Sequence, residues 1–176
     1  MSASLVSIRG LDPEEARGRA DALAELLIAC VEAGASVSFM APLLREKARA
    51  FWQAAADDVF RGARALLVAE DGTGEVIGTV QLVLEQPENQ PHRADLAKML
   101  VHPRSRRQGV GGRLMRAAED TARTARKTLL VLDTASADAE RLYERSGWTK
   151  VGIIPGYALW PDGRPCATTF YYKPIG

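Results

Sequence analysis

Apolar residues recur at helical spacing near the start of the chain. Asp12 precedes Pro13, and Glu15 stands three positions after Asp12, which is the pattern of a capped helix start. Gly34 supplies a left-handed stop. The pattern predicts one amphipathic helix of about five turns. Its apolar positions are Leu23, Leu26, Leu27, Cys30 and Val31.

The next segments predict a second helix and then a hairpin. A helix is expected from Leu44 to Phe60, with Gly62 closing it. Strands are expected over Ala65–Glu70 and Val76–Glu85, joined by a turn that contains Gly72 and Gly74. The second strand is apolar on both faces, as expected inside a sheet.

Strands and helices alternate in the rest of the chain. This alternation predicts an α/β (α+β) domain with a mixed, twisted sheet of about six to seven strands flanked by helices. With 176 residues and no linker or repeat, the chain is expected to be a single domain, 1–176. The expected elements are the strand Ala94–Val101, the helix Gly109–Arg126, the strand Leu129–Asp133, the helix Ala137–Arg145 and two final strands.

Charge and composition exclude several partners. The 23 Lys and Arg residues nearly cancel the 22 Asp and Glu residues, so no field collects nucleic acid or an anionic membrane. The start Met1-Ser2-Ala3-Ser4 lacks a basic segment followed by an apolar run. No stretch approaches the about 20 apolar residues of a membrane span. We therefore expect a cytoplasmic protein.

Metal binding and nucleophilic catalysis find little support. Cys30 and Cys166 lack a second ligand at zinc spacing, and His92 and His102 are isolated. No metal site is predicted. No G-x-S-x-G elbow is present, although a nucleophile assembled from distant segments stays open.

The segment from Lys98 to Met115 carries the clearest chemistry. A strand ends, a basic loop follows, and a glycine cluster opens a helix whose first amide groups have no intrahelical partner. Such a helix start attracts an anion. Charged donors and flexible backbone come from Arg106, Arg107, Gly109, Gly111, Gly112 and Arg113.

Three readings compete for this loop. A P-loop needs Lys-Ser or Lys-Thr after its last glycine, but Gly112 is followed by Arg113. A dinucleotide fingerprint needs Gly or Ala at position 114, which is Leu114. A simple tight turn would not explain three arginines within the same few residues.

The loop resembles the signature of the GNAT superfamily: Arg or Gln, two residues, Gly, one residue, then Gly or Ala. Arg106 to Gly111 match it in full, and Ala139 to Trp148 look like the second cofactor-binding helix of that family. The resemblance implies acetyl-CoA as acyl donor, a splayed strand pair that binds it, and pantetheine on the backbone of Met99, Leu100 and Val101. It further implies that the amides from Gln108 through Val110 to Arg113 hold the pyrophosphate. Ser136, which stands where the family often has Asn near the start of the second helix, is the expected further contact of the pantetheine arm.

A closer likeness points to the tabtoxin resistance protein branch of the family. It rests on Gly34 to Met40, Lys98 to Val101, Pro155-Gly156-Tyr157 and Pro161 to Arg164. The branch acetylates a small β-lactam amino-acid toxin. Such a likeness does not transfer a substrate, because pocket residues differ while the scaffold stays.

Three residues are candidates for acid–base work. Asp133 ends an apolar strand at its carboxyl end, where it serves either as the base that accepts the amine proton or as a helix cap. Asp95 is a second candidate base, and an ordered water chain is a third. In the toxin-resistance branch, an Asp133-like carboxylate and a Tyr143-like phenol are implicated in catalysis. The resemblance therefore favours Asp133 as base and Tyr143 as general acid.

The sequence thus predicts direct transfer of an acetyl group to the primary amine of a small molecule. Phe39, Met40 and Tyr157, with Asp133, are the expected acceptor contacts. Alternatives are a protein or peptide N-acetyltransferase, or a CoA-binding sensor without turnover. A monomer or a homodimer is expected, the latter paired through an exposed C-terminal strand, Thr168 to Lys173.

Overall fold

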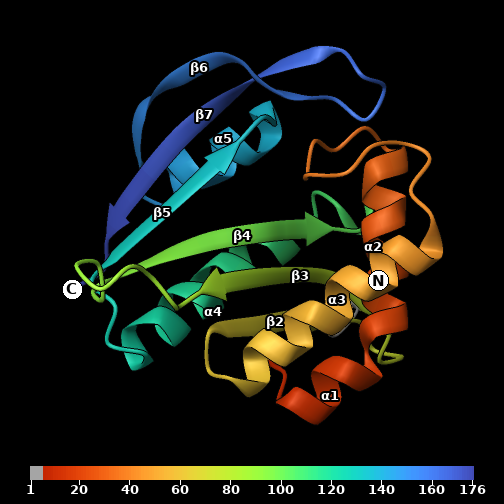
Figure 1. Cartoon of the computed structure of the whole chain (residues 1–176), viewed down its shortest axis with the longest axis horizontal. Helices are drawn as coiled ribbons and strands as arrows, with labels where there is room; N and C mark the ends of the chain where they lie inside the picture. The colour runs from red at the N-terminus through yellow and green to blue at the C-terminus, as the bar shows by residue number, and fades with distance from the viewer. Residues whose placement is uncertain (1–5) are drawn as a thin grey trace.

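A computed structural model describes residues 6–176 as a sheet of seven strands with helices on both faces (Figure 1). The segment Met1–Ser4, considered above for a leader, lies outside the described residues. The strand order is β1-β2-β3-β4-β5-β7-β6, and only β4 and β5 run parallel. The predicted mixed α/β sheet is confirmed. The strands are β1 Ser7–Gly10, β2 Arg64–Glu70, β3 Val76–Val83, β4 Arg93–Val101, β5 Leu129–Thr134, β6 Thr149–Leu159 and β7 Pro165–Pro174.

The sheet divides the core into two layers, and helices cover each of them. In Figure 1 the first three helices lie in front of β2, β3 and β4, and α4 lies behind them. Alternate residues of β2 serve both layers, since Leu66 and Val68 pack with the front helices while Leu67 and Ala69 pack with α4. The helices are α1 Pro13–Gly18, α2 Ala20–Glu32, α3 Arg45–Phe60, α4 Val110–Thr124 and α5 Ala137–Arg145.

The prediction of one continuous first helix is wrong, because the segment is divided at Arg19 into α1 and α2. Arg19 has φ −94° and ψ 2°, and ends α1. Its guanidinium pairs with Glu70 at 2.7 Å and donates to the carbonyl of Gly74 at 3.3 Å. Glu70 is buried, and its charge is met by Arg19 and by Arg9, whose Nε donates to it at 3.0 Å. The capping box of Asp12 and Glu15 is present as predicted.

The C-terminal strand is not the exposed edge that the sequence suggested. β7 lies between β5 and β6, and its residues Thr168, Thr169 and Tyr171 are buried. The edge is β6, where Val151 and Ile153 are exposed. After β6 the chain turns back, and β7 inserts between β5 and β6. Local sequence patterns do not encode this strand order. The edge strand β1, four residues long, was not predicted because it is too short for a period of two.

A buried ion pair fastens β7 to α4. Lys173 Nζ donates to the two carboxylate oxygens of Glu119 at 2.7 and 2.8 Å and to the carbonyl of Ser146 at 2.6 Å. The Glu119 side chain is only 9% exposed, and that of Lys173 is 19% exposed. The pair thus links α4, β7 and the end of α5.

Replacing Lys173 should leave this buried carboxylate without hydrogen bonds from a cation, since Arg123 lies 3.8 Å away. We expect Lys173→Met to lower the free energy of unfolding by about 3 kcal/mol, measured by urea denaturation. The double variant Glu119→Leu, Lys173→Met should regain most of that loss, because no unpaired charge remains. A loss under about 1 kcal/mol in the single variant would contradict a buried, mutually dependent pair.

Candidate functional site

β4 and β5 separate soon after they begin, and this opens the sheet. Their parallel pairing is limited to Arg93–Asp95 with Leu129–Val131. Beyond Asp95 the edge of β4 that faces β5 has no strand partner, and Figure 1 shows the two strands spreading apart. Backbone groups along that edge are free to pair with an extended ligand. The predicted splayed strand pair is therefore present.

The loop after β4 presents a row of free backbone donors. Gly109 is the N-cap of α4 in a left-handed conformation, φ 80°, and no side chain caps the helix. The amides of the first turn, from Val110 to Gly112, are therefore without an intrahelical partner. A Cβ on Gly111 would lie 3.1 Å from a Leu142 side-chain carbon, so this glycine also lets α4 and α5 approach. The same loop accordingly serves helix packing and anion attraction.

The predicted phosphate-binding side chains differ in their availability. Arg106 donates to the carbonyl of Val101 at 3.3 Å, and Arg113 to that of Val6 at 2.7 Å. Gln108 donates to the carbonyl of Arg104 at 3.1 Å. Arg107 is exposed and left-handed, with φ 60°, and makes no hydrogen bond or ion pair within residues 6–176. Arg107 is thus the loop cation that is free to meet a ligand.

Tyr143 lies on α5 with its ring buried and its hydroxyl unpaired. The ring packs against Trp148 and Tyr171, at centroid distances of 5.9 and 5.8 Å. Its hydroxyl has no hydrogen bond within residues 6–176, yet it is not among the fully buried polar atoms that lack a partner. The oxygen therefore reaches the surface. Burial of the ring and the charge of Asp133 raise the pKa of the phenol, so it stays protonated at neutral pH.

Asp133, Asp95 and Lys98 influence one another across the gap between β4 and β5. Desolvation raises the pKa of Asp133, the Lys98 ammonium opposes that rise, and the Asp95 charge adds to it. Asp95 is already engaged, because it pairs with Arg93 and accepts from Gln86 at 3.3 Å. Asp133 has no such partner among the described residues. Of the two carboxylates, Asp133 is the one available to a ligand.

The predicted acceptor residues lie where the N-terminal half meets the C-terminal hairpin. Ser36 Oγ donates to the carbonyl of Leu159 at 2.8 Å, and the Ala41 amide donates to that of Pro161 at 3.0 Å. These bonds hold the loop of residues 35–43 against the hairpin. Phe39 packs edge-on against Phe51, at 5.3 Å, while the neighbouring Met40 is 43% exposed.

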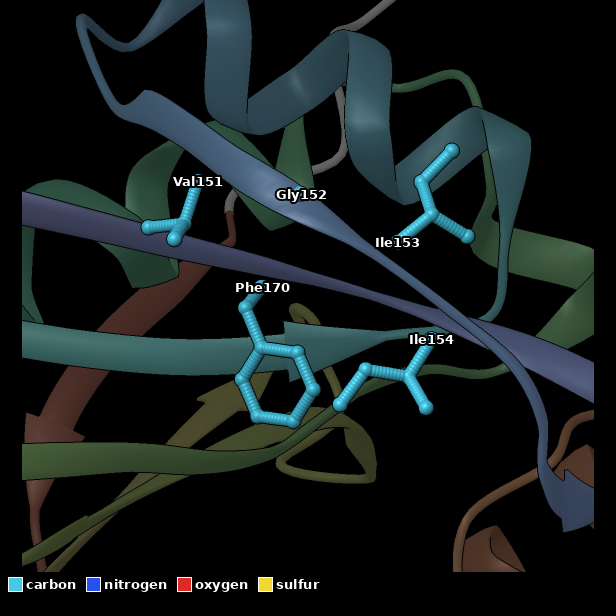
Figure 2. Close-up of a pocket in the computed structure, with 5 residues that line it drawn as sticks. All are labelled: Val151, Gly152, Ile153, Ile154 and Phe170. Carbon is cyan, nitrogen blue, oxygen red and sulfur yellow. The ribbon is translucent and has the colours of Figure 1, made fainter.

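Tyr157 stands at the other side of the gap, edge-on to Phe170 at 5.4 Å. Phe170 is in register with Asp133, so the two side chains share one face of the sheet. A shallow groove of about 310 Å³ begins at Phe170 and runs along β6. Figure 2 shows Ile154 of β6 extending toward the Phe170 ring. The groove is lined by Val151, Gly152, Ile153, Ile154 and Phe170.

The structure adds detail at positions about which the sequence says little. The Ser136 hydroxyl accepts from the Ala139 amide at 3.3 Å and so caps α5. Sequence reasoning missed Lys98 and Ser38 as site residues, because their left-handed backbone, φ 49° and 76°, has no sequence signal in non-glycine residues. It also missed Phe170, which the strand register alone places beside Asp133.

Comparison with known proteins identifies the class. The model of the acetyltransferase (GNAT) family matches residues 22–148, which is more than half of the chain. The chain therefore belongs to the GNAT family, and it is an enzyme of the acyl-CoA N-acyltransferase class. The resemblance noted in the sequence is confirmed at this level.

Solved structures share the fold over nearly the whole chain. One from Salmonella typhimurium, described as an acetyltransferase with its cofactor acetyl-CoA, has a TM-score of 0.80 and 22% identity, covering 98% of this chain and 95% of its own. A phosphinothricin acetyltransferase from Sinorhizobium meliloti in complex with AcCoA has a TM-score of 0.77 and 16% identity, covering 97% and 89%. A ribosomal-protein-alanine N-acetyltransferase from Brucella melitensis has a TM-score of 0.76 and 21% identity, covering 96% and 99%. At these identities the likeness shows the fold alone.

Two further features of the described residues complete the picture. Within residues 6–176 no group of three or more His, Cys, Asp or Glu side chains is placed to hold a metal ion. None of the helices in that part of the chain is long and apolar enough to cross a membrane.

The electrostatic pattern can be tested by titration. We expect the pKa of Asp133, followed by carboxyl-detected NMR, to lie above its ordinary value of 3.8. Lys98→Met should raise it further, because the variant removes a positive charge that favours the carboxylate. Asp162, whose pKa Arg164 lowers, is the control that should not respond to Lys98→Met. An Asp133 titration unmoved by that variant would show that the two groups do not share a site.

Proposed function

We propose that the protein transfers the acetyl group of acetyl-CoA to the primary amine of a small molecule. The observation that carries the proposal is the gap between β4 and β5, with free amides of α4 at one end and Tyr143 and Asp133 beside it. Family membership supplies the reaction class. The continuous sheet supports one acetyltransferase domain over residues 1–176.

The residues present fit the donor. The uncapped start of α4 and Arg107 offer amide and guanidinium donors to a pyrophosphate. The unpartnered edge of β4 at Met99, Leu100 and Val101 offers backbone groups to the amides of a pantetheine arm. Structures with acetyl-CoA bound share this fold, which supports the same assignment here.

The chemistry follows from the two titratable groups that face the gap. The acceptor amine attacks the thioester carbonyl, forming the new C–N bond, and the C–S bond breaks to release CoA thiolate. Tyr143 gives its proton to the thiolate, which has a pKa near that of Cys, about 8.5. The surplus amine proton passes to Asp133, directly or through water. The raised pKa of Asp133 makes this carboxylate a better proton acceptor than an ordinary aspartate.

Closure of the gap favours a small acceptor over a peptide. The loop of residues 35–43 is bonded to the β6–β7 hairpin through Ser36 and Ala41, which limits the room for a chain passing through. The likeness to the toxin-resistance branch and to phosphinothricin acetyltransferases supports the same choice. A protein N-terminus is the second candidate acceptor, because a ribosomal-protein-alanine N-acetyltransferase shares the fold.

The proposal is tested by a screen for thiol release with small amines and with short peptides. Release with small amines, and little with peptides, is the expected result. Melting-temperature scans should show stabilisation by CoA and none by NAD or ATP, because a ligand stabilises the native state that binds it. A protein that CoA stabilises, but that releases no thiol with any acceptor, would instead be a CoA-binding sensor.

Tyr143→Phe should separate catalysis from packing, since it keeps the ring and removes only the hydroxyl. We expect kcat to fall by about a hundredfold or more, with the KM for acetyl-CoA and the melting temperature little changed. Tyr171→Phe is the matched control. Its hydroxyl lies 3.1 Å from a Glu140 oxygen and 3.0 Å from a Glu144 oxygen and can donate to one of them, so this variant should lose stability and keep turnover. Wild-type kcat in Tyr143→Phe would assign the proton to another donor.

Arg107 and Arg126 form a natural pair for testing pyrophosphate binding. Both are exposed and left-handed, with φ of 60° and 59°, but they lie beyond opposite ends of α4. We expect Arg107→Gln to weaken acetyl-CoA binding by about tenfold in calorimetry, through loss of a charge-assisted contact. Arg126→Gln should leave the Kd unchanged. Equal affinities in the two variants would remove Arg107 from the donor site.

A further inference from the structure

Lys98 occupies an unusual position in β4. It lies in the bulge where the pairing with β3 shifts, between Gln81↔Ala97 and Thr79↔Leu100. Its backbone is left-handed, φ 49°, a conformation that costs a non-glycine residue free energy. The bulge re-aims the side chain out of the regular alternation of the strand. Such a strained residue persists where the surrounding structure demands it.

The Lys98 ammonium contacts the loop of residues 35–43 and the α3 helix. Nζ donates to Ser38 Oγ at 3.1 Å and lies 5.6 Å from the centre of the Phe51 ring. Ser38 is itself left-handed, with φ 76°. Two strained residues from distant parts of the chain thus place a cation and a hydroxyl side by side at the acceptor end of the gap.

Two other cations on the strands around the gap, Arg64 and Arg93, are already neutralised, and Lys98 is not. Arg64 binds Asp58 through two guanidinium nitrogens, at 2.9 and 3.1 Å, and Arg93 pairs with Asp95. Lys98 forms no ion pair within residues 6–176, and its partners are a hydroxyl and an aromatic ring. Desolvation lowers the pKa of Lys98, whereas the charge of Asp133 favours the protonated form. A partly desolvated ammonium without a counter-ion is relieved by binding an anion.

We propose that Lys98, assisted by Ser38, binds the carboxylate of the acceptor, so that the acceptor is an amino acid. The inference rests on the proposed function and adds a specificity-determining residue, which would explain why the acceptor carries a carboxylate. The gap offers one free ammonium at Lys98 and one free carboxylate at Asp133. An amino acid presents the complementary pair, its carboxylate to Lys98 and its amine to Asp133. A doubly charged phosphate would leave one negative charge without a partner.

A structural role for Lys98 gives different expectations. If the lysine only joined β4 to the loop through Ser38, its loss would loosen the gap for every acceptor alike. A carboxylate-binding role affects acceptors with a carboxylate and spares those without one. Matched pairs of acceptors therefore distinguish the two roles.

The test uses leucine, methionine, glutamate and lysine, each beside its α-carboxamide, together with neutral alkylamines, in the thiol-release assay. We expect the wild-type protein to prefer the α-carboxylate member of at least one pair. Lys98→Met should raise the KM for that acid at least about tenfold and leave the KM for its amide and for acetyl-CoA unchanged. Lys98→Arg, which keeps the charge, should retain most of the preference. Ser38→Ala should show a smaller effect in the same direction.

Several results would overturn the inference. Equal KM values for acids and amides in the wild-type protein, or a Lys98→Met variant that weakens both alike, would leave the acetyltransferase proposal standing and refute the carboxylate site. Thiol release from none of the amines or acids would refute the proposed function and, with it, this inference. Melting temperatures of the variants within a few degrees of wild type show that the comparison is made on folded protein.

Discussion

The molecule depends on a parallel strand pair that is kept very short. After three residues in register, β4 and β5 part, so a stretch of sheet edge is left unpaired inside the fold. Unsatisfied backbone groups are costly unless water or a ligand meets them. The free edge of β4 can meet this need by binding an extended ligand. The uncapped amides at the start of α4 lie at the same end of the gap and add further donors. Backbone groups do not depend on side-chain identity, so such an edge is compatible with the low identity, 22% and 21%, at which solved structures share this fold.

Contacts between the two halves of the sheet then set the width of the gap. On one side, the loop of residues 35–43 is bonded to the β6–β7 hairpin. On the other, Lys173 joins β7 to α4 through Glu119. Tyr143 of α5 packs against Tyr171, whereas Asp133 of β5 is in register with Phe170, so the two side chains lie on opposite faces of the sheet. They are still close enough for the charge of Asp133 to raise the pKa of the Tyr143 phenol.

The sequence predicted the elements around the candidate site that local chemistry determines. The glycine-rich junction between β4 and α4 was predicted, and so was the helix from Ala137 to Arg145, at its observed bounds. What it could not supply depends on tertiary structure. Arg19 breaks a helical pattern because buried Glu70 attracts its side chain, and Lys98 turns left-handed because β3 and β4 shift register. The place of β7 between β5 and β6 depends on how the β6–β7 hairpin packs onto the sheet. The hydrophobic periodicity of the sequence carries no information on this.

The cysteines argue for direct transfer rather than an acyl-enzyme. Cys30, one of two in the chain, lies close to the donor strand, with its sulfur 3.6 Å from the Val101 carbonyl. A thiolate there would be a candidate nucleophile, but burial raises the pKa of this thiol and keeps it protonated. Cys166 is also buried and contacts Ser36. Both thiols are buried, which favours the proposed direct transfer to an amine over an acyl-enzyme.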